Sequence, residues 1–353
     1  MTTNKKILSI ELYRGAASLA VLFYHLSGAF LKHFQFDPLR GLAHHGYLGV
    51  DFFFVLSGFV IMHSHYGENG QPNKIRAYLA KRFFRIFPTY WCHLILIIGI
   101  RLLGWYFLQN YHSTEALSTT NILKNIILVK PEKYLIGPAW SLSYELFFYL
   151  LFAFLFFIGR NGYLVIAGVY TLLITFQSVH YESFFTDTFI VEFFLGNLSA
   201  LALNASKNWT PNQLRLSAHI ALSLGAFLLT GFAIYIYMGG NVNAHFKLLR
   251  IFDIGLASTL IIYASCVLEK IGQKVPLIAS DMGRISYSLY ISHGIFVSLF
   301  EQVATKIAHF NLIALNLIYL SIIAFCIFWA ISFNTLIEKR IAQYVRRRDP
   351  LSL

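Results

Sequence analysis

Two ionisable residues near the start of the sequence have the types and the spacing of a reactive pair. Arg14 and His25 are eleven positions apart in one apolar run. On an α-helix this spacing is three turns plus about 20°, so both side chains would share one face, about 16 Å apart along the axis. Glu11 and Ser18 fall on nearly the same stripe. Because an imidazole is a natural general base and a guanidinium suits phosphate or a polarised carbonyl, the stripe is a candidate catalytic site.

Each of these side chains also has a structural interpretation. Arg14 could snorkel to the inner headgroups, and His25 could make an interhelical hydrogen bond. An ionisable side chain near mid-membrane costs about 2.5–3.5 kcal/mol, so Glu11, Arg14, His25 and Glu145 would together cost roughly 10 kcal/mol if unpaired. A whole protein has only about 5–15 kcal/mol of stability. These groups must therefore be paired, face a cavity, or both, and their shared face favours a functional role.

A second polar stripe is expected on the helix that begins near residue 139. Its members, spaced at i, i+4 and i+8, are Ser141, Glu145 and Tyr149. Glu145 lies about as far below the outer surface as His25, and a carboxylate there could hold the imidazole tautomer and raise its basicity. Asp51, at a similar depth, is a second candidate partner. The alternative is a structural Glu145 bonded to a neighbouring hydroxyl.

Other polar positions point more weakly to function. A third face, at i, i+4 and i+7, carries Ser286, Tyr290 and His293, for which core hydrogen bonding is the alternative role. Ser57 precedes Gly58, a pair that permits close helix approach, so packing is its expected role. His63 and His65 lie on different helix faces, and with the other histidines they give no convincing metal site.

The elements that position these stripes must be membrane helices. The chain has 353 residues, of which 57% are hydrophobic and 12% charged, against roughly 45–50% and 25% in a soluble domain. This composition excludes a water-soluble globule, a disordered chain, collagen and a coiled coil. The net charge of +12 therefore indicates membrane topology rather than nucleic-acid binding. The three cysteines lie in apolar stretches and are odd in number, so they predict no disulfide framework.

Ten segments are long enough to cross a hydrocarbon core of about 30 Å. They fall at about 7–29, 47–66, 88–108, 139–158, 162–180, 187–205, 216–238, 246–268, 285–304 and 312–335. We expect an all-α polytopic transmembrane bundle of about ten helices, forming one domain over 1–338 with a basic cytoplasmic tail over 339–353. The first run is expected to be retained rather than cleaved, because Glu11 and Arg14 interrupt it. An interfacial helix is expected over 74–87, before Pro88, and an external loop over about 109–138.

The distribution of basic residues predicts the orientation. With a cytoplasmic N-terminus, eight lysines and arginines lie outside: Lys32, Arg40, Lys124, Lys130, Lys133, Lys247, Arg250 and Lys306. Arg14 and Arg101 lie within spans, so of 28 such residues in total, 18 lie inside (28 − 8 − 2). The positive-inside rule then places the N-terminus in the cytoplasm, and an even number of helices returns the C-terminus there.

Five segments together resemble the acyltransferase 3 family, a class of bacterial membrane acyltransferases. They are 11–15 with His25, the family's signature of Arg, ten residues and His; 49–59; 82–88; 140–145 with Tyr149; and 286–290 with His293. They occur in family order over 11–293.

The resemblance implies an O-acyltransferase, usually an O-acetyltransferase, in the bacterial cytoplasmic (inner) membrane. The acyl group would pass from cytoplasmic acyl-coenzyme A, usually acetyl-coenzyme A, to a hydroxyl of an envelope or exported carbohydrate or a lipid-linked glycan. Arg14 and His25 are the expected essential pair, and no metal and no nucleic acid are implied. The fused extracellular hydrolase-like domain that the family often carries is not expected, so we predict a stand-alone membrane domain.

Donor and acceptor chemistry suggests a role for each group. Lys81, Arg82 and Arg85, with Arg14, would attract the donor phosphates, although positive-inside anchoring explains them too. His25 would be the base for the acceptor hydroxyl or a transient acyl carrier, oriented by Glu145, and Arg14 would steer the donor or polarise its carbonyl. Tyr290 and His293 would support the donor channel. Supporting positions are Glu11, Asp51, Ser57, Trp140, Ser141, Ser143, Tyr149 and Ser286.

Two other classes of function compete with this interpretation. A transporter or flippase of a glycan or small solute would also line its pathway with intramembrane charges, but it predicts inverted repeats, and none is found by inspection. A structural or sensory membrane protein would use the polar stripes as interhelical contacts. It would have no need for Arg14 and His25 to share a face.

Overall fold

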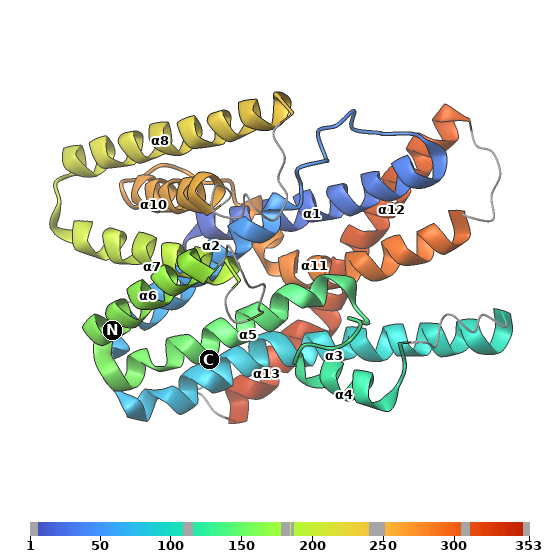
Figure 1. Cartoon of the computed structure of the whole chain (residues 1–353), viewed down its shortest axis with the longest axis horizontal. Helices are drawn as coiled ribbons and strands as arrows, with labels where there is room; N and C mark the ends of the chain where they lie inside the picture. Colours follow the sequence, from blue (N-terminus) through green and yellow to red (C-terminus); the bar gives the residue numbers. More distant parts are fainter. Residues whose placement is uncertain are drawn as a thin grey trace. The chain divides into compact units, whose positions relative to one another are not determined.

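The computed structural model describes residues 6–108, 116–177, 184, 187–239, 251–304 and 311–348. Within these ranges the chain forms helices and no strand (Figure 1). The longer helices are α1 (Leu8–Phe34), α2 (Leu48–His65), α3 (Ile75–Leu108), α5 (Trp140–Ala153), α6 (Leu155–Gln177), α7 (Phe189–Ala205), α8 (Pro211–Tyr237), α10 (Leu256–Lys270), α11 (Ile278–Ala304) and α12 (Leu312–Phe333). Every predicted span overlaps one of these helices, so the all-α helical bundle is confirmed.

Shorter elements link the long helices. They are α4 (Thr119–Ile127), α13 (Lys339–Arg348), two π-helical turns at Ile251–Gly255 and Asn334–Glu338, and 3-10 turns at Tyr66–Glu68, Pro72–Lys74, Gly137–Ala139 and Ser206–Asn208. Within α6, Gly159 has φ +69° and breaks the helical path between the two predicted spans there. Parts of the predicted spans, loops and tail lie outside the described residues: 1–5, 109–115, 178–183, 185–186, 240–250, 305–310 and 349–353, with Lys5, Lys247, Arg250 and Lys306 among them.

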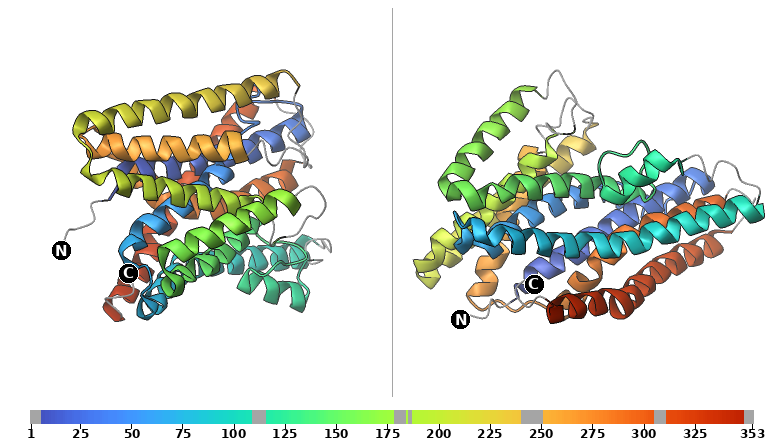
Figure 2. Two further views of the ribbon diagram at one scale, coloured as in Figure 1. Left: turned by 60° about the vertical axis from the view of Figure 1, so that its left-hand side comes forward. Right: turned by 90° about the horizontal axis from the view of Figure 1, so that it is seen from below.

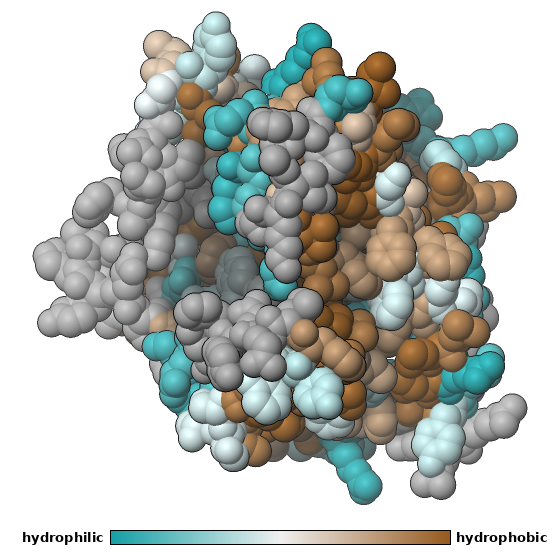
Figure 3. All heavy atoms as spheres, turned by 90° about the vertical axis from the view of Figure 1, so that its right-hand side faces the viewer, coloured by the Kyte–Doolittle hydropathy of each residue, from teal (hydrophilic) through white to brown (hydrophobic). Residues whose placement is uncertain are grey.

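Six helical stretches of the described chain are long and apolar enough to cross a membrane. They are Leu48–Glu68, Pro72–Phe107, Leu155–Ile174, Phe189–Asn208, Pro211–Tyr237 and Leu312–Val345. Large apolar side chains are exposed on them, such as Ile95 (71%), Phe227 (73%) and Ile313 (72%). Apolar areas are also visible on the face drawn in Figure 3. Soluble proteins rarely expose such areas, whereas lipid tails cover them readily.

The chain divides into two compact units. Unit 1 comprises Met1–Ala17, Leu48–Lys74 and Leu150–Gly283; unit 2 comprises Ser18–Tyr47, Ile75–Tyr149 and Arg284–Leu353. Helices α1, α5 and α11 contribute residues to both. Each unit is described by itself below.

Close backbone approach holds α2 against α7 in unit 1. A Cβ added at Gly58 would meet the carbonyl oxygen of Phe193, and one added at Gly196 would meet that of Val55. Both positions therefore require glycine, and Gly58 has the packing role expected of the Ser57-Gly58 pair. Beside this pair, α8 runs along α10 in the same unit (Figures 1 and 2).

The core of unit 2 lies where α1, α11 and α12 meet. It is built from Leu22, Leu26, Ala29, Phe30, Leu289, Val297, Leu315, Tyr319, Cys326 and Ala330. The Phe30 ring stacks on that of Phe300 at 4.9 Å and meets Tyr319 edge-on at 5.2 Å. Since Phe30 is fully buried, it fixes the rotation of α1 against α11, and with it the direction of His25.

Helix α3 differs from the two segments that we expected. It runs without interruption from Ile75 to Leu108 and contains Pro88, where we expected an interfacial helix to end. Proline removes one backbone donor from the helix. Aromatic contacts span the proline: the Phe83 ring stacks on that of Phe87 with centroids 5.0 Å apart, and the Phe87 ring lies 5.3 Å from that of Trp91 at a tilt of 50°. Contacts on both sides of Pro88 thus oppose a break.

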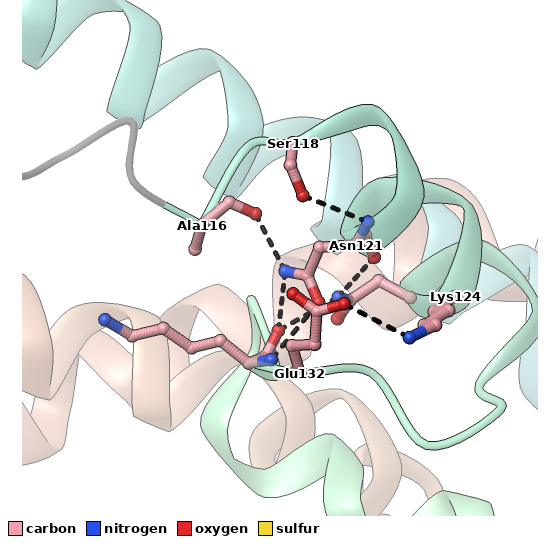
Figure 4. A network of polar contacts seen from close by, with 7 residues as sticks. Ala116, Ser118, Asn121, Lys124 and Glu132 are labelled. Carbon is pink, nitrogen blue, oxygen red and sulfur yellow. Dashed lines mark hydrogen bonds and ion pairs between the residues drawn. The ribbon is translucent and has the colours of Figure 1, made fainter.

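The predicted external loop contains a polar framework within its described part (Figure 4). Ser118 caps α4 by accepting from the Asn121 amide at 3.3 Å. The side-chain amide of Asn121 donates to the carbonyls of Ala116 (2.8 Å) and Lys133 (3.0 Å). Lys124 pairs with Glu132 at 3.2 Å. These bonds tie the two arms of the segment together just before α5 begins.

Asn125 completes this framework, and its loss should destabilise unit 2. Its buried side chain donates to the carbonyls of Asn121 (2.9 Å) and Lys133 (3.0 Å) and accepts from the Leu135 amide (2.9 Å). Asn125→Ala would strand these backbone groups, so we expect the free energy of unfolding to fall by about 2 kcal/mol. Thermal unfolding of the purified protein measures this change. Asn316→Ala, which removes one exposed hydrogen bond, should cost far less, and equal losses would contradict the prediction.

Candidate active site

The twelve predicted site residues that lie in unit 2 come from α1, α3, α5 and α11. They are His25, Lys81, Arg82, Arg85, Trp140, Ser141, Ser143, Glu145, Tyr149, Ser286, Tyr290 and His293. The other four, Glu11, Arg14, Asp51 and Ser57, belong to unit 1. Most of the predicted site therefore falls in one compact unit.

His25 sits on an open side of α1 beside a second imidazole. Its side chain is exposed, and its ring centroid lies 5.4 Å from that of His293, with the two rings inclined by 33°. The Tyr24 ring meets it edge-on at 5.1 Å. Gly28, one turn further along α1, leaves open space where a side chain would stand. The His25 ring is therefore held by aromatic neighbours and still accessible to another molecule.

His293 is fully buried, and only one of its two ring nitrogens forms a hydrogen bond to a described residue. Its Nδ1 lies 3.2 Å from the carbonyl oxygen of Leu289, one helical turn before it. Because a carbonyl can only accept, Nδ1 carries the proton and Nε2 is left with a lone pair. Among the described residues Nε2 has no hydrogen-bond partner. Buried polar atoms are normally hydrogen-bonded, so this nitrogen is a candidate functional group.

A hydroxyl pair joins this face of α11 to the start of α5. The Tyr290 and Ser141 hydroxyls are 2.8 Å apart, and both lie near the carbonyl oxygen of Pro138, at 3.3 and 3.1 Å. Tyr290 also lies 5.8 Å from His293 between ring centroids. The two stripes predicted separately, on α5 and on α11, thus face each other in unit 2.

Gly294 permits this approach, and filling it should disturb the site. A Cβ added there would lie 2.6 Å from Cδ of Pro138. We expect Gly294→Ala to push α11 away from Pro138, to weaken the Tyr290–Ser141 contact and to lower the free energy of unfolding by about 1–3 kcal/mol. Gly99→Ala is the matched control, because nothing lies within 4 Å of a Cβ there. Thermal unfolding measures the difference, and an unchanged Gly294→Ala protein would contradict the expectation.

Glu145 is built into a group of aromatic and basic side chains. Its carboxylate accepts the hydroxyl of Tyr149, its predicted neighbour one turn away. The guanidinium of Arg82 lies 5.5 Å from the Tyr149 ring centroid and 5.7 Å from that of Tyr78. The Tyr78 hydroxyl donates to the Tyr149 carbonyl at 3.0 Å. The α5 stripe and the basic segment of α3 therefore meet around Tyr149.

The rest of the basic segment continues toward α11. The Arg85 guanidinium lies 5.9 Å from the Tyr287 ring centroid, and the Tyr287 hydroxyl donates to the carbonyl of Ile86 at 2.9 Å. The Arg85 side chain is exposed and that of Lys81 half-buried. Two arginines on α3 thus rest on tyrosine faces, an arrangement that orients each guanidinium.

Arg14 has a partner within unit 1. Its guanidinium lies 3.8 Å from Glu11, whose carboxylate also pairs with Lys6 at 3.3 Å. A Cβ added at Gly283 would collide with the Glu11 side chain, so glycine at this position of α11 leaves room for the carboxylate. The requirement that these charges be paired is met for Glu11 and Arg14. Asp51 is also fully buried in unit 1.

Three supporting residues of unit 2 have different surroundings. The Ser143 hydroxyl donates to the Leu128 carbonyl at 2.8 Å and meets the Tyr134 hydroxyl at 3.0 Å, so it anchors the loop that precedes α5. Burial raises the pKa of Tyr134, which therefore stays protonated. Trp140 meets the Tyr144 ring edge-on at 5.9 Å, and Ser286 is buried on α11.

Sequence reasoning missed a carboxylate that lies after the last predicted span. Glu338 closes the π-helical turn Asn334–Glu338. Its oxygens accept from Thr89 (3.1 Å), Ser288 (2.8 Å) and Asn334 (2.5 Å). The only signal in the sequence was the i, i+4 spacing of Asn334 and Glu338. Glu338 thereby links α3, α11 and the end of α12 in unit 2.

His93 and the cysteines are further reactive groups among the described residues. His93 is fully buried, with Nδ1 2.9 Å from the Thr89 carbonyl and Nε2 accepting from the Trp329 indole at 3.3 Å. Cys266 and Cys326 are buried and Cys92 is half-buried, and none forms a disulfide. Within the described ranges no three metal-ligating side chains come together.

Several long apolar helices with exposed apolar side chains define a multi-pass membrane protein. The chain belongs to the acyltransferase 3 family: residues 7–335 match the family described as an acyltransferase domain. No solved structure shows significant similarity to the chain.

Curated relatives match over parts of their length. The exopolysaccharide production protein ExoZ of Rhizobium meliloti is 30% identical over 212 residues, which are 56% of this chain and 63% of ExoZ. The peptidoglycan O-acetyltransferase OatA of Listeria monocytogenes is 24% identical over 168 residues, 40% of this chain and 25% of OatA. Protein 2 in the picA locus of Rhizobium radiobacter is 30% identical over 109 residues, 30% of this chain and 49% of that protein. The chain thus spans less than two thirds of each of these relatives.

Proposed function

We propose that the protein is a membrane O-acyltransferase that moves an acyl group, acetyl in the first instance, from cytoplasmic acyl-coenzyme A to a hydroxyl of an envelope or exported carbohydrate. The family supports acyl transfer. One relative's name specifies O-acetylation of peptidoglycan, and another's specifies exopolysaccharide production. Both names concern a carbohydrate polymer of the cell envelope or exterior, which supports a carbohydrate hydroxyl as the proposed acceptor.

The observation that carries this proposal is the open imidazole of His25. A base for acyl transfer must be reachable by its substrate and must be held in position. The His25 side chain is exposed, while His293 and Tyr24 bracket its ring at 5.4 and 5.1 Å. The unpartnered Nε2 of the neighbouring His293 adds a buried acceptor beside it. A structural histidine that only joins two helices would not need to be open.

The reaction can follow two routes, which consume the same substrates and release the same products. In direct transfer, His25 takes the proton of the acceptor hydroxyl while the hydroxyl oxygen attacks the thioester carbonyl. The C–O bond forms and the C–S bond breaks. The thiolate leaves and takes up a proton. In the relay, a His25 nitrogen first attacks the thioester carbonyl, and the leaving thiolate takes up the imidazole proton. The acceptor oxygen then takes the acyl group from the imidazole, and the hydroxyl proton returns to the ring. Both routes give an ester and free coenzyme A.

The charged groups are assigned to the donor. Arg82 and Arg85, oriented on tyrosine faces, would hold donor phosphates at the predicted cytoplasmic side, assisted by Lys81. Arg14, whose position is set by its pairing with Glu11, would steer the donor or polarise its carbonyl. Tyr290 and His293 would support the donor channel.

Glu145 is assigned a positioning role. The sequence suggested that it orients the imidazole, and its carboxylate accepts the Tyr149 hydroxyl next to Arg82. We therefore propose that it acts through Tyr149, on whose ring Arg82 rests. A positioning role would be supported if Glu145→Gln raised the KM for the donor more than it lowered kcat.

The function can be tested with the purified chain in liposomes. Acetyl-coenzyme A labelled in the acetyl group would be supplied together with candidate polysaccharides. Label that appears in an alkali-labile ester on the polysaccharide supports acyl transfer. Movement of a solute across the bilayer without covalent change would support the transporter alternative. Without any acceptor, release of one thiol per protein would indicate the relay, and no release would indicate direct transfer.

A further inference from the structure

Unit 1 contains a cavity of about 560 Å³ that the proposed reaction does not use. It lies where several helix ends converge. Lys6 precedes α1, His63 belongs to the last turn of α2, Lys207 follows α7, and Lys270 ends α10. The topology predicted from basic residues places all of these ends on the cytoplasmic side. The volume lies within the range of small-molecule sites, about 300–1,000 Å³.

The cavity carries a surplus of positive charge. Lys207 and Lys270 are exposed at its edge, and neither forms an ion pair with any described residue. The acidic residue in its lining, Glu269, is already engaged, because its two oxygens accept the backbone amides of Leu8 and Ser9, both at 2.8 Å. The Glu269 carboxylate thus caps the start of α1 and forms no ion pair with either of these two described lysines, so the lining keeps a net positive charge.

The rest of the lining combines the polar side chains of His63 and Asn204 with aromatic and apolar ones. Tyr66 contributes a ring that is backed by Arg160, whose guanidinium lies 5.4 Å from the ring centroid and bonds its hydroxyl. Leu203 and Cys266, which are 8% and 3% exposed, form part of the wall. A cationic edge together with apolar lining residues fits a ligand with an anionic head and an apolar stem.

Lysines at helix C-termini have a simpler role, since they offset the helix dipole. That role accounts for Lys207 and Lys270 one at a time. It does not account for their convergence on one cavity, for the engagement of Glu269 elsewhere, or for the apolar walls. Basic pockets between membrane helices on the cytoplasmic side are suited to phosphorylated headgroups.

We propose that this cavity binds a phosphate group carried on an apolar stem, held by Lys207 and Lys270. An anionic phospholipid headgroup has this chemistry, and the phosphate of a soluble nucleotide shares part of it. The proposal does not depend on the acyl-transfer function, because none of its residues takes part in the proposed reaction.

The test compares lipids and variants of the full chain in detergent. Phosphatidylglycerol and the zwitterionic phosphatidylcholine would be titrated separately, with binding followed by native mass spectrometry and by the shift in thermal unfolding. Adenosine 3′,5′-bisphosphate would be titrated as the soluble phosphate. The double variant Lys207→Gln/Lys270→Gln should weaken phosphate binding at least about tenfold. Lys274→Gln, an exposed lysine four positions further along that does not line the cavity, should leave it unchanged.

Each result bears on the proposal. Phosphatidylglycerol binding that the double variant weakens, and that Lys207→Arg/Lys270→Arg restores, would support a lipid headgroup. The same dependence seen only with adenosine 3′,5′-bisphosphate would support a soluble phosphate. The proposal would be overturned if neither probe bound better than phosphatidylcholine, or if Lys274→Gln weakened binding as much as the double variant.

Discussion

Replacing His25 with alanine is expected to lower the rate of acyl transfer by at least about 10²–10⁴-fold, which is the contribution of a positioned general base. If His25 carries the acyl group itself, transfer should stop altogether. The imidazole is exposed, so its removal leaves no large internal void and the protein should accumulate and unfold normally. Turnover of labelled acetyl-coenzyme A in liposomes measures the first effect, and thermal unfolding measures the second.

A control and a rescue make this prediction specific. His45→Ala removes another exposed imidazole of unit 2 and should leave transfer unchanged. Free imidazole added to the His25→Ala protein can enter the open site and should restore part of the rate. Near-normal turnover in His25→Ala would refute the assignment. A loss of folding together with activity would assign the residue to structure instead.

Removing the carboxylate of Glu338 is expected to have the largest effect on stability. It accepts hydrogen bonds from Thr89, Ser288 and Asn334 at 3.1, 2.8 and 2.5 Å, and all three donors are buried. Glu338→Ala would leave these donors without their acceptor. Hydrogen bonds to a charged group contribute about 1.5–3 kcal/mol each, and relief of the carboxylate's own burial offsets part of the loss. We expect a net decrease of about 3 kcal/mol in the free energy of unfolding.

Glu301→Ala provides the comparison for Glu338. Glu301 pairs with Lys32 at 3.2 Å and His33 at 3.5 Å at the surface of unit 2. An exposed ion pair contributes about 0–1 kcal/mol, so its removal should hardly change thermal unfolding. If both variants unfolded alike, Glu338 would be an ordinary surface carboxylate and the linking role assigned to it would be wrong.

Most of the fold could be predicted from the sequence because a membrane helix is a local feature. Length and hydropathy placed ten spans, and each overlaps a helix. Where prediction and structure differ, contacts beyond the local sequence decide the outcome. Pro88 indicated a boundary, yet aromatic contacts between Phe83, Phe87 and Trp91 bridge it. The framework around Asn125 in the predicted loop depends on backbone groups eight and ten residues away.

In the site, too, contacts between sequence neighbours could be predicted, whereas contacts between residues far apart in the sequence could not. The i, i+4 spacing predicted the neighbours Glu145 and Tyr149, which are hydrogen-bonded. No spacing could place His293 beside His25, because the two residues are 268 positions apart and meet only through packing of α1 against α11. Glu338 was missed for the same reason, since its partners Thr89 and Ser288 lie on other helices.

The π-helical turn Asn334–Glu338 sets the direction in which the chain after it faces. Such a turn accommodates one residue more than an α-helical turn, and each residue of an α-helix rotates the following side chains by about 100°. If the same residues were wound as an ordinary α-helix, everything that follows would swing by about that angle. The Glu338 carboxylate would turn away from Ser288 and Thr89, and α13 would turn with it. A homologue with one residue fewer at this junction could instead hold an acceptor in the same place with an ordinary α-helical turn.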